Sequence, residues 1–191
     1  ANIQLKGSEL GYDIADRELA ARVTDTVKQR EMEGYSYESA DASFELLLRS
    51  ETDALDPAFE VTRWRVLTSD EVSQEGDSEA TVKVRVGDAV VSRVGEGFGP
   101  LNALDHALRS ALVAEHPDVE SFELTDYRVR ILETGHGTDA IVRVLIDTTD
   151  GERNWTTVGV GTNVVEASWE ALHDAYLWGL LDAPQSMQRA R

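Results

Sequence analysis

The sequence predicts an α+β fold in which two βββα units form a pseudo-twofold domain behind a small helical subdomain. The first observation is a repeat: FEVTRWRV at 59–66 returns as FELTDYRV at 122–129, and the alternating segment 80–84 returns at 140–144. The second is that each copy ends in a glycine-rich segment that opens into a helical pattern. Two copies about 60 residues apart are too few for a solenoid, so we expect one duplicated supersecondary unit.

The residues ahead of the repeats carry helical periodicity. Apolar side chains recur at helical spacing across 16–33, where Asp16 is placed to cap the N-terminus and Gly34 to end the helix. A second helix is predicted across 39–49 from an apolar stripe that includes Phe44. Together these segments predict a helical subdomain that precedes the duplicated domain.

The strands of the two copies differ in how much apolar surface they present. In the first copy Val82 and Val84 alternate with polar residues, which is the pattern of a sheet with one solvent-exposed face. In the second copy Ile141 and Leu145 add apolar side chains to the opposite face. We therefore expect the second sheet to lie nearer a buried seam.

Each copy closes with a tight turn, a third strand and a helix. The turns are predicted at 87–88 and 150–151. Alanines recur every four residues in both helices, from Ala103 and from Ala167, and such small side chains allow a helix to approach its neighbour closely. The predicted organisation is a helical subdomain at 1–50, a polar hinge at 51–58, a double domain at 59–183 with repeats at 59–114 and 122–183, and a disordered tail at 184–191.

Composition and charge exclude several classes of function. The 191-residue chain has 41% hydrophobic residues and no cysteine, which excludes disulfides and thiolate sites and suits a reducing cytoplasm. Its formal net charge of -18 repels phosphate backbones and anionic lipid, so neither nucleic acid nor a membrane is expected as a partner. No apolar run approaches the roughly 20 residues that span a bilayer. Because the sequence starts in mid-pattern at Ala1, we expect a fragment of a longer protein.

The segment GEGFGPLNA at 95–103 joins a strand to a helix and is a candidate binding site. Glycines let the backbone approach a ligand, and the first turn of a helix presents unpaired N–H groups that suit a carboxylate or phosphate. A plain turn before a helix competes with this interpretation, and Pro100 breaks the dinucleotide-binding fingerprint. The second copy repeats the arrangement at 159–164 without the proline.

No catalytic centre is predicted. The four histidines show no metal-ligand spacing, and His116 and His136 fall in predicted loop and turn positions. No arrangement of serine, histidine and aspartate stands out. The four tryptophans are expected in core or interface packing.

Five ordered blocks carry a resemblance to a known family: GYSYESADASFELL at 34–47, EATVKV at 79–84, NALDHALR at 102–109, DYRVRIL at 126–132 and NVVEASWEAL at 163–172. Together they closely resemble the C-terminal part of citramalate synthases, which belong with the 2-isopropylmalate and homocitrate synthases. The resemblance implies a helical linker followed by a LeuA-type allosteric and dimerising regulatory domain of two βββα units. It also implies that the catalytic TIM barrel, which binds a divalent metal and acetyl-CoA, is missing, so no cofactor and no catalytic residue are expected in this chain.

The same resemblance implies a homodimer that is inhibited by an end-product amino acid, isoleucine in citramalate synthases or leucine in 2-isopropylmalate synthases. The family places this effector at the glycine-rich helix start. The implied effector-binding residues are Gly97, Phe98, Gly99, Pro100, Leu101 and Asn102, with Leu124, Tyr127 and Thr162 around the side chain. The family pattern has asparagine at Phe98 and serine at Gly161, so a dimerisation module without effector binding is the alternative to either amino-acid-binding domain.

Overall fold

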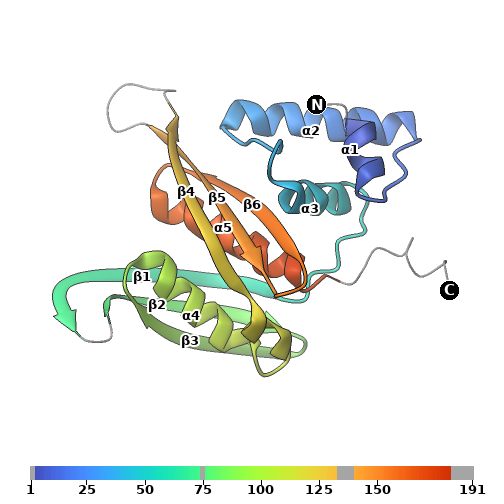
Figure 1. The fold of residues 1–191 in the computed structure, drawn as a ribbon. Helices are drawn as coiled ribbons and strands as arrows, with labels where there is room; N and C mark the ends of the chain where they lie inside the picture. The colour runs from blue at the N-terminus through green and yellow to red at the C-terminus, as the bar shows by residue number, and fades with distance from the viewer. Residues whose placement is uncertain (1–2, 74–75, 133–139, 182–191) are drawn as a thin grey trace.

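The chain folds into two antiparallel three-stranded sheets, each carrying a helix, beside a helical subdomain (Figure 1). The computed structural model describes residues 3–73, 76–132 and 140–181, and the predicted tail at 184–191 lies outside the described residues. The helical subdomain comprises α1 (Ile3–Glu9), α2 (Arg17–Glu33) and α3 (Asp41–Glu51). The first unit comprises β1 (Glu60–Ser73), β2 (Gly76–Val86), β3 (Ala89–Gly97) and α4 (Pro100–Leu112), and the second β4 (Glu123–Leu132), β5 (Ile141–Thr149), β6 (Asn154–Gly161) and α5 (Val164–Gly179). The predicted α+β class with duplicated βββα units is confirmed.

Helix α2 begins and ends where the sequence predicts. The Asp16 side chain accepts a hydrogen bond from the backbone N–H of Glu18 (2.9 Å), and Gly34 ends the helix with a φ of 112°. Helix α3 starts and ends two residues later than predicted, because an apolar stripe marks the face of a helix better than its ends. Helix α1 and a 3-10 helix at Pro117–Ser121 were not predicted, since elements this short show no clear periodicity.

A glycine on the third strand of each unit lets the helix lie against the sheet. A Cβ atom at Gly95 would lie 2.3 Å from the backbone nitrogen of Ala107, and one at Gly159 would lie 2.0 Å from the carbonyl oxygen of Ala167. The neighbour that the alanine stripe approaches is therefore the third strand of the same unit. Both units bury their strands and helices in one shared core.

The helical subdomain covers the outer face of the second sheet, at the top of Figure 1. Val158 of β6 shares a core with Phe44 and Leu48 of α3. Leu145 of β5 packs against the same core. The additional apolar side chains of the second copy thus face a buried seam, and the seam is formed with the helical subdomain. No described helix covers the outer face of the first sheet in this way, and Lys83 on that face is exposed.

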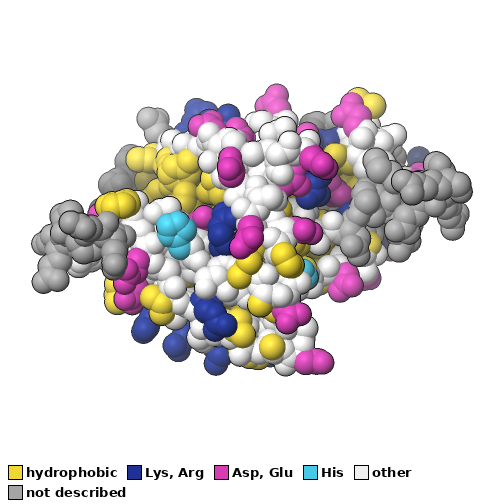
Figure 2. All heavy atoms as spheres, turned by 60° about the horizontal axis from the view of Figure 1, so that its bottom comes forward, with side chains coloured by type: hydrophobic (Ala, Val, Ile, Leu, Met, Phe, Trp, Pro, Cys, Tyr) yellow, Lys and Arg dark blue, Asp and Glu magenta, His cyan; other side chains and the backbone are white. Residues whose placement is uncertain are grey.

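The surface is mixed in character. The face turned forward in Figure 2 carries scattered Asp and Glu side chains, and Lys and Arg side chains gather toward its lower left. Apolar side chains gather at its upper left. Within the described ranges, no helix combines the length and the apolar character that crossing a bilayer requires.

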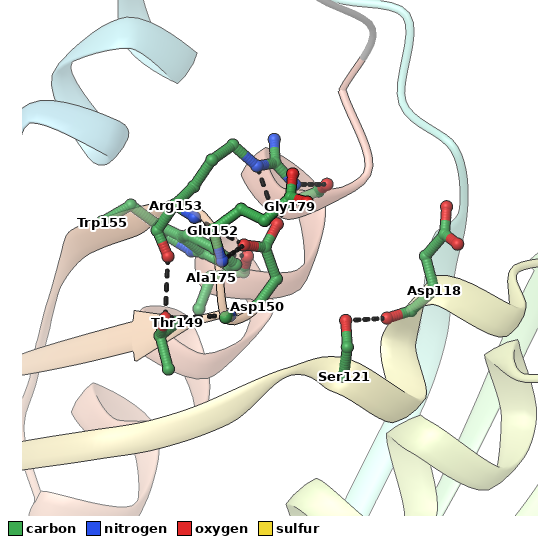
Figure 3. A network of polar contacts seen from close by, with 10 residues as sticks. Asp118, Ser121, Thr149, Asp150, Glu152, Arg153, Trp155, Ala175 and Gly179 are labelled. Carbon is green, nitrogen blue, oxygen red and sulfur yellow. Dashed lines mark hydrogen bonds and ion pairs between the residues drawn. The ribbon is translucent and has the colours of Figure 1, made fainter.

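The turn between β5 and β6 is tied to the end of α5 (Figure 3). Gly151 adopts a φ of 91°, and the Asp150 carboxylate accepts hydrogen bonds from the backbone N–H groups of Glu152 (3.0 Å) and Arg153 (2.7 Å). The Arg153 guanidinium pairs with Asp150 and donates to the carbonyl oxygen of Gly179 (3.0 Å). Burial opposes ionisation of Asp150, but these hydrogen bonds outweigh it and lower its pKa. The turn therefore fixes the second sheet relative to its helix.

Candidate functional site

A cavity of about 710 Å³ opens where the first turn of α4 faces β4 and the start of α5. Its lining residues that the sequence had singled out are Phe98, Gly99, Pro100, Leu101, Asn102, Leu124 and Tyr127. Its other lining residues are Leu104, Asp105, Arg109, Phe122, Glu123, Val164, Val165 and Ser168. The cavity thus joins both βββα units, and it brings together most of the residues that the resemblance implied.

Two side chains accept hydrogen bonds from the backbone just before α4. Gly99 has a φ of 97°, and its N–H donates to Asp77 Oδ1 (2.8 Å). The N–H of Phe98 donates to Asn102 Oδ1 (3.1 Å). The next N–H groups, of Leu101 and Asn102, lie in the first helical turn, where no carbonyl of the helix itself can accept from them. This turn therefore offers donors to an anionic group in the cavity.

Of the implied residues at the start of this segment, Phe98 lines the cavity and Gly97 does not. A Cβ atom at Gly97 would lie 2.4 Å from Asn102 Oδ1, so this glycine makes room for the Asn102 side chain and does not itself line the cavity. The Phe98 side chain lies at the rim and is 71% exposed. The Phe98 side chain, at which the resemblance implied an asparagine, is therefore largely in solvent.

One wall of the cavity is polar, and sequence reasoning missed it. The Asp105 carboxylate pairs with Arg109 of the next turn (3.2 Å) and accepts a hydrogen bond from the Tyr176 hydroxyl (2.7 Å). The Arg109 guanidinium also donates to the carbonyl oxygens of Val119 and Phe122. Burial raises the pKa of Tyr176, and the Asp105 charge raises it further, so this hydroxyl remains a donor. The spacing of an Asp and an Arg four residues apart on a predicted helix was the available signal.

The opposite wall joins β4 to α5. The Tyr127 and Ser168 hydroxyl groups are hydrogen-bonded (2.6 Å), and the Ser168 hydroxyl donates to the carbonyl oxygen of Val164 (2.5 Å). Leu124 and Val165 make this wall apolar apart from the two hydroxyl groups. Ser168 was not predicted, because its position on the cavity side of α5 depends on how the two units pack.

The start of α5 differs from the start of α4. The Asn163 side chain accepts a hydrogen bond from the N–H of Glu166 (2.9 Å), and the Thr162 hydroxyl donates to the Glu166 carboxylate (3.0 Å). A Cβ atom at Gly161 would lie 2.9 Å from Cβ of Glu166. The Asn163 side chain therefore occupies one first-turn donor of α5, and Thr162 does not line the cavity.

The pseudo-twofold counterpart of the cavity is a groove of about 490 Å³ between β1 and α5. Aligning the repeats places Trp64 at the position of Tyr127, and Trp169 at the position of Asp105. The Trp64 and Trp169 rings stack at 5.3 Å. Two indole rings thus occupy in one groove the positions that a phenol and a carboxylate hold in the other.

Two of the histidines, His106 and His173, take part in hydrogen bonding and packing. His106 Nδ1 lies 2.6 Å from the carbonyl oxygen of Glu96, and the His173 ring packs edge-on against Phe59 at 5.4 Å. His136 lies outside the described residues. Across residues 3–73, 76–132 and 140–181, no three His, Asp or Glu side chains gather in a way that could hold a metal ion.

Comparison with known proteins gives one family. Residues 38–177 match the family described as the LeuA allosteric (dimerisation) domain. The chain is 52% identical over 185 residues to an (R)-citramalate synthase of Streptomyces coelicolor, an alignment that covers 96% of this chain and 35% of that protein. It is 42% identical to an (R)-citramalate synthase of Synechocystis sp., with 94% of this chain and 34% of that protein covered.

More distant relatives are 2-isopropylmalate synthases. The chain is 31% identical over 170 residues to a 2-isopropylmalate synthase of Shewanella amazonensis, with 89% of this chain and 30% of that protein covered. The chain therefore spans about a third of the length of the curated relatives that it matches.

Proposed function

The chain belongs to the family of LeuA allosteric (dimerisation) domains, and we propose that it is the regulatory and dimerising domain of an acetyl-CoA-dependent (R)-citramalate synthase. In this proposal the α4 cavity binds isoleucine, the end product, as a feedback inhibitor. The observation that carries the proposal is the cavity itself, which combines first-turn donors, one polar wall and one apolar wall.

The chemistry of the cavity suits a branched amino acid. The first turn of α4 offers N–H groups and a partial positive charge to a carboxylate. Leu101, Leu124 and Val165 offer apolar surface to a branched side chain, and each buried methylene contributes about 0.8 kcal/mol. A ligand of this size is held between β4, α4 and α5, so its binding would bias how the two units pack.

Helix α5 connects the cavity to the helical subdomain. On one side Ser168 lines the cavity. On the other side Glu170 accepts a hydrogen bond from the Tyr35 hydroxyl (2.5 Å), and Asp174 accepts one from the Ser43 hydroxyl (3.0 Å). A ligand that shifts α5 therefore shifts the surface on which the helical subdomain rests. Coupling of this kind amounts to about 1 to 3 kcal/mol and is limited by the ligand's differential affinity for the two arrangements.

The second candidate is a leucine-binding domain of a 2-isopropylmalate synthase, which the more distant relatives favour. The greater identity to citramalate synthases favours the first candidate. Assay of the whole enzyme with pyruvate against 2-oxoisovalerate separates the two. A dimerisation module without effector binding is the third alternative, and the ligand titration described next addresses it.

Calorimetric titration of isoleucine and leucine into the chain tests the proposal. We expect isoleucine to bind, and we expect Asp105→Trp to abolish binding because it copies the indole of Trp169 into the cavity. Val90→Trp is the matched control, since Val90 is 50% exposed and does not line the cavity. Silence of the wild-type chain toward both amino acids at millimolar concentration would leave only the dimerisation module.

A further inference from the structure

We propose that Asp105 receives the ammonium group of the amino acid and thereby makes the cavity select α-amino acids over 2-oxo acids of the same carbon skeleton. This inference rests on the proposed function and adds the residue that determines the class of ligand.

The position of Asp105 on α4 suits this role. The helix begins at Pro100, and Asp105 lies one turn beyond Leu101, about 6 Å along the axis at 1.5 Å per residue. Leu101, Asn102 and Asp105 line the same cavity. First-turn donors and a carboxylate are therefore present in one cavity, as the carboxylate and ammonium groups of one amino acid require.

The partners of Asp105 hold its carboxylate in place and leave it acceptor capacity. Its side chain is 14% exposed. Its Oδ1 accepts from the Tyr176 hydroxyl (2.7 Å), and Arg109 Nη2 donates to both Oδ1 (3.4 Å) and Oδ2 (3.2 Å). A carboxylate offers about four acceptor positions, so these two donors leave room for an ammonium group. The Arg109 guanidinium is itself anchored by the carbonyl oxygen of Phe122 (2.8 Å). The site is therefore formed before a ligand arrives, which reduces the ordering cost of binding.

The pseudo-equivalent site at α5 provides a comparison within the same chain. At the pseudo-equivalent position of α5, Trp169 stacks on Trp64 and offers no carboxylate. At the start of α5, the Asn163 side chain accepts a hydrogen bond from the N–H of Glu166. Only the α4 cavity, of these two pseudo-equivalent sites, combines an open first turn with a carboxylate one turn further along.

The preference for an amino acid over a 2-oxo acid follows from which groups donate and which accept hydrogen bonds at Asp105. A 2-oxo acid presents a carbonyl oxygen where the amino acid presents an ammonium group. That oxygen is an acceptor and faces the acceptor oxygens of Asp105, so the pair repels and the carboxylate is left without a ligand donor. Sites that hydrogen-bond a specific donor reject ligands that lack it far more strongly than apolar pockets reject a missing methylene.

The test uses calorimetric titration of the 191-residue chain with isoleucine and with 3-methyl-2-oxopentanoate, its 2-oxo counterpart. We expect the wild-type chain to bind isoleucine at least about tenfold more tightly than the 2-oxo acid. We expect Asp105→Asn to weaken isoleucine binding about tenfold or more. The ratio of its affinities for isoleucine and for the 2-oxo acid should be smaller than in the wild-type chain. Asp88→Asn is the matched control, because Asp88 is exposed and does not line the cavity, and it should retain both isoleucine binding and the preference for isoleucine over the 2-oxo acid.

Each outcome has a separate meaning. Isoleucine binding within twofold of wild type in Asp105→Asn overturns this inference and leaves the proposed function standing. So does wild-type binding of the 2-oxo acid as tight as that of isoleucine, a comparison that needs no variant and is therefore independent of whether a variant folds. A wild-type chain that binds neither isoleucine nor leucine overturns the proposed function together with this inference. Circular dichroism of each variant verifies that it is folded.

Discussion

Single residues make the two pseudo-equivalent grooves different in size and chemistry. Tyr127 and Asp105 leave a cavity, whereas Trp64 and Trp169 stack in the other groove. The duplication of the βββα unit therefore supplies two similar frameworks, and side-chain size at two positions makes them different. Glycines act at the same scale: Gly95 is the point where a strand and a helix backbone come into contact.

Replacing Gly95 by alanine should destabilise the fold by about 2 to 3 kcal/mol. The new Cβ atom would lie 2.3 Å from the Ala107 nitrogen and 2.5 Å from the Ala103 oxygen, and backbone atoms of a helix cannot yield as a side chain can. The free energy of unfolding in urea measures the effect.

Gly87→Ala is the control for this experiment. Gly87 has a φ of 57°, and a Cβ atom there meets nothing within 4 Å. Only the conformational penalty of about 1 kcal/mol is then expected. Equal losses in the two variants would contradict the close approach of α4 to β3.

At the scale of elements, α5 is the part of the molecule that serves two surfaces. It closes one wall of the cavity and also carries the polar side chains on which the helical subdomain rests. Side chains of α3 and α5 also accept hydrogen bonds from the edge strand β6. The N–H of Val158 donates to the Ser43 hydroxyl (3.0 Å), and the N–H of Val160 donates to the Glu170 carboxylate (2.9 Å). An edge strand that would otherwise present free N–H groups is thus paired with side chains.

Glu170, at the contact between α5 and the helical subdomain, makes the stability of the fold depend on pH. Burial raises its pKa above the ordinary value of 4.5, and the Asp174 carboxylate adds to the rise, while hydrogen bonds from Tyr35 and Val160 oppose it. Because the folded chain binds this proton more tightly than the unfolded chain, protonation of Glu170 favours folding. The contribution is present in full below about pH 4.5 and is lost as the pH rises through the elevated pKa.

Replacing Glu170 by glutamine should remove this dependence. The free energy of unfolding of the wild-type chain minus that of Glu170→Gln should therefore fall as the pH is raised from 4 toward 7. The altered hydrogen bonds add a difference that does not change with pH, so they do not affect this trend. Urea unfolding of both proteins across this range measures the difference. Parallel stability profiles would show that Glu170 has an ordinary pKa in the folded chain.

At the scale of the whole molecule, charge is the dominant feature. The formal net charge is -18, from 36 acidic and 18 basic residues. Like charges at this density oppose the compact state, and the ion pairs on the surface offset only a small part of that repulsion. The stability of the chain should accordingly respond to ionic strength.

Adding NaCl from 10 to 200 mM at pH 7 should raise the thermal unfolding midpoint. Over this range the Debye length shortens from about 30 Å to about 7 Å, which screens repulsion across the molecule. Differential scanning calorimetry at a series of salt concentrations measures the effect. A gain that begins only above about 1 M salt would indicate exclusion of salt from the surface instead.

The sequence by itself determined the duplicated βββα architecture, the caps of α2 and the glycine-rich start of α4, because periodicity, capping residues and repeated words are local properties of a chain. It also indicated the family. It did not determine that the start of α4 opens into a cavity shared with β4 and α5, since that depends on how the two units pack.

Only the tertiary structure decided that Asp105, Arg109 and Ser168 line the cavity and that the apolar face of the second sheet meets the helical subdomain. These residues come from different elements, and their meeting depends on the angle and depth at which helices pack on sheets. Such packing is set by many weak contacts acting together, among them the backbone approach at Gly95, and no local pattern in the sequence encodes it.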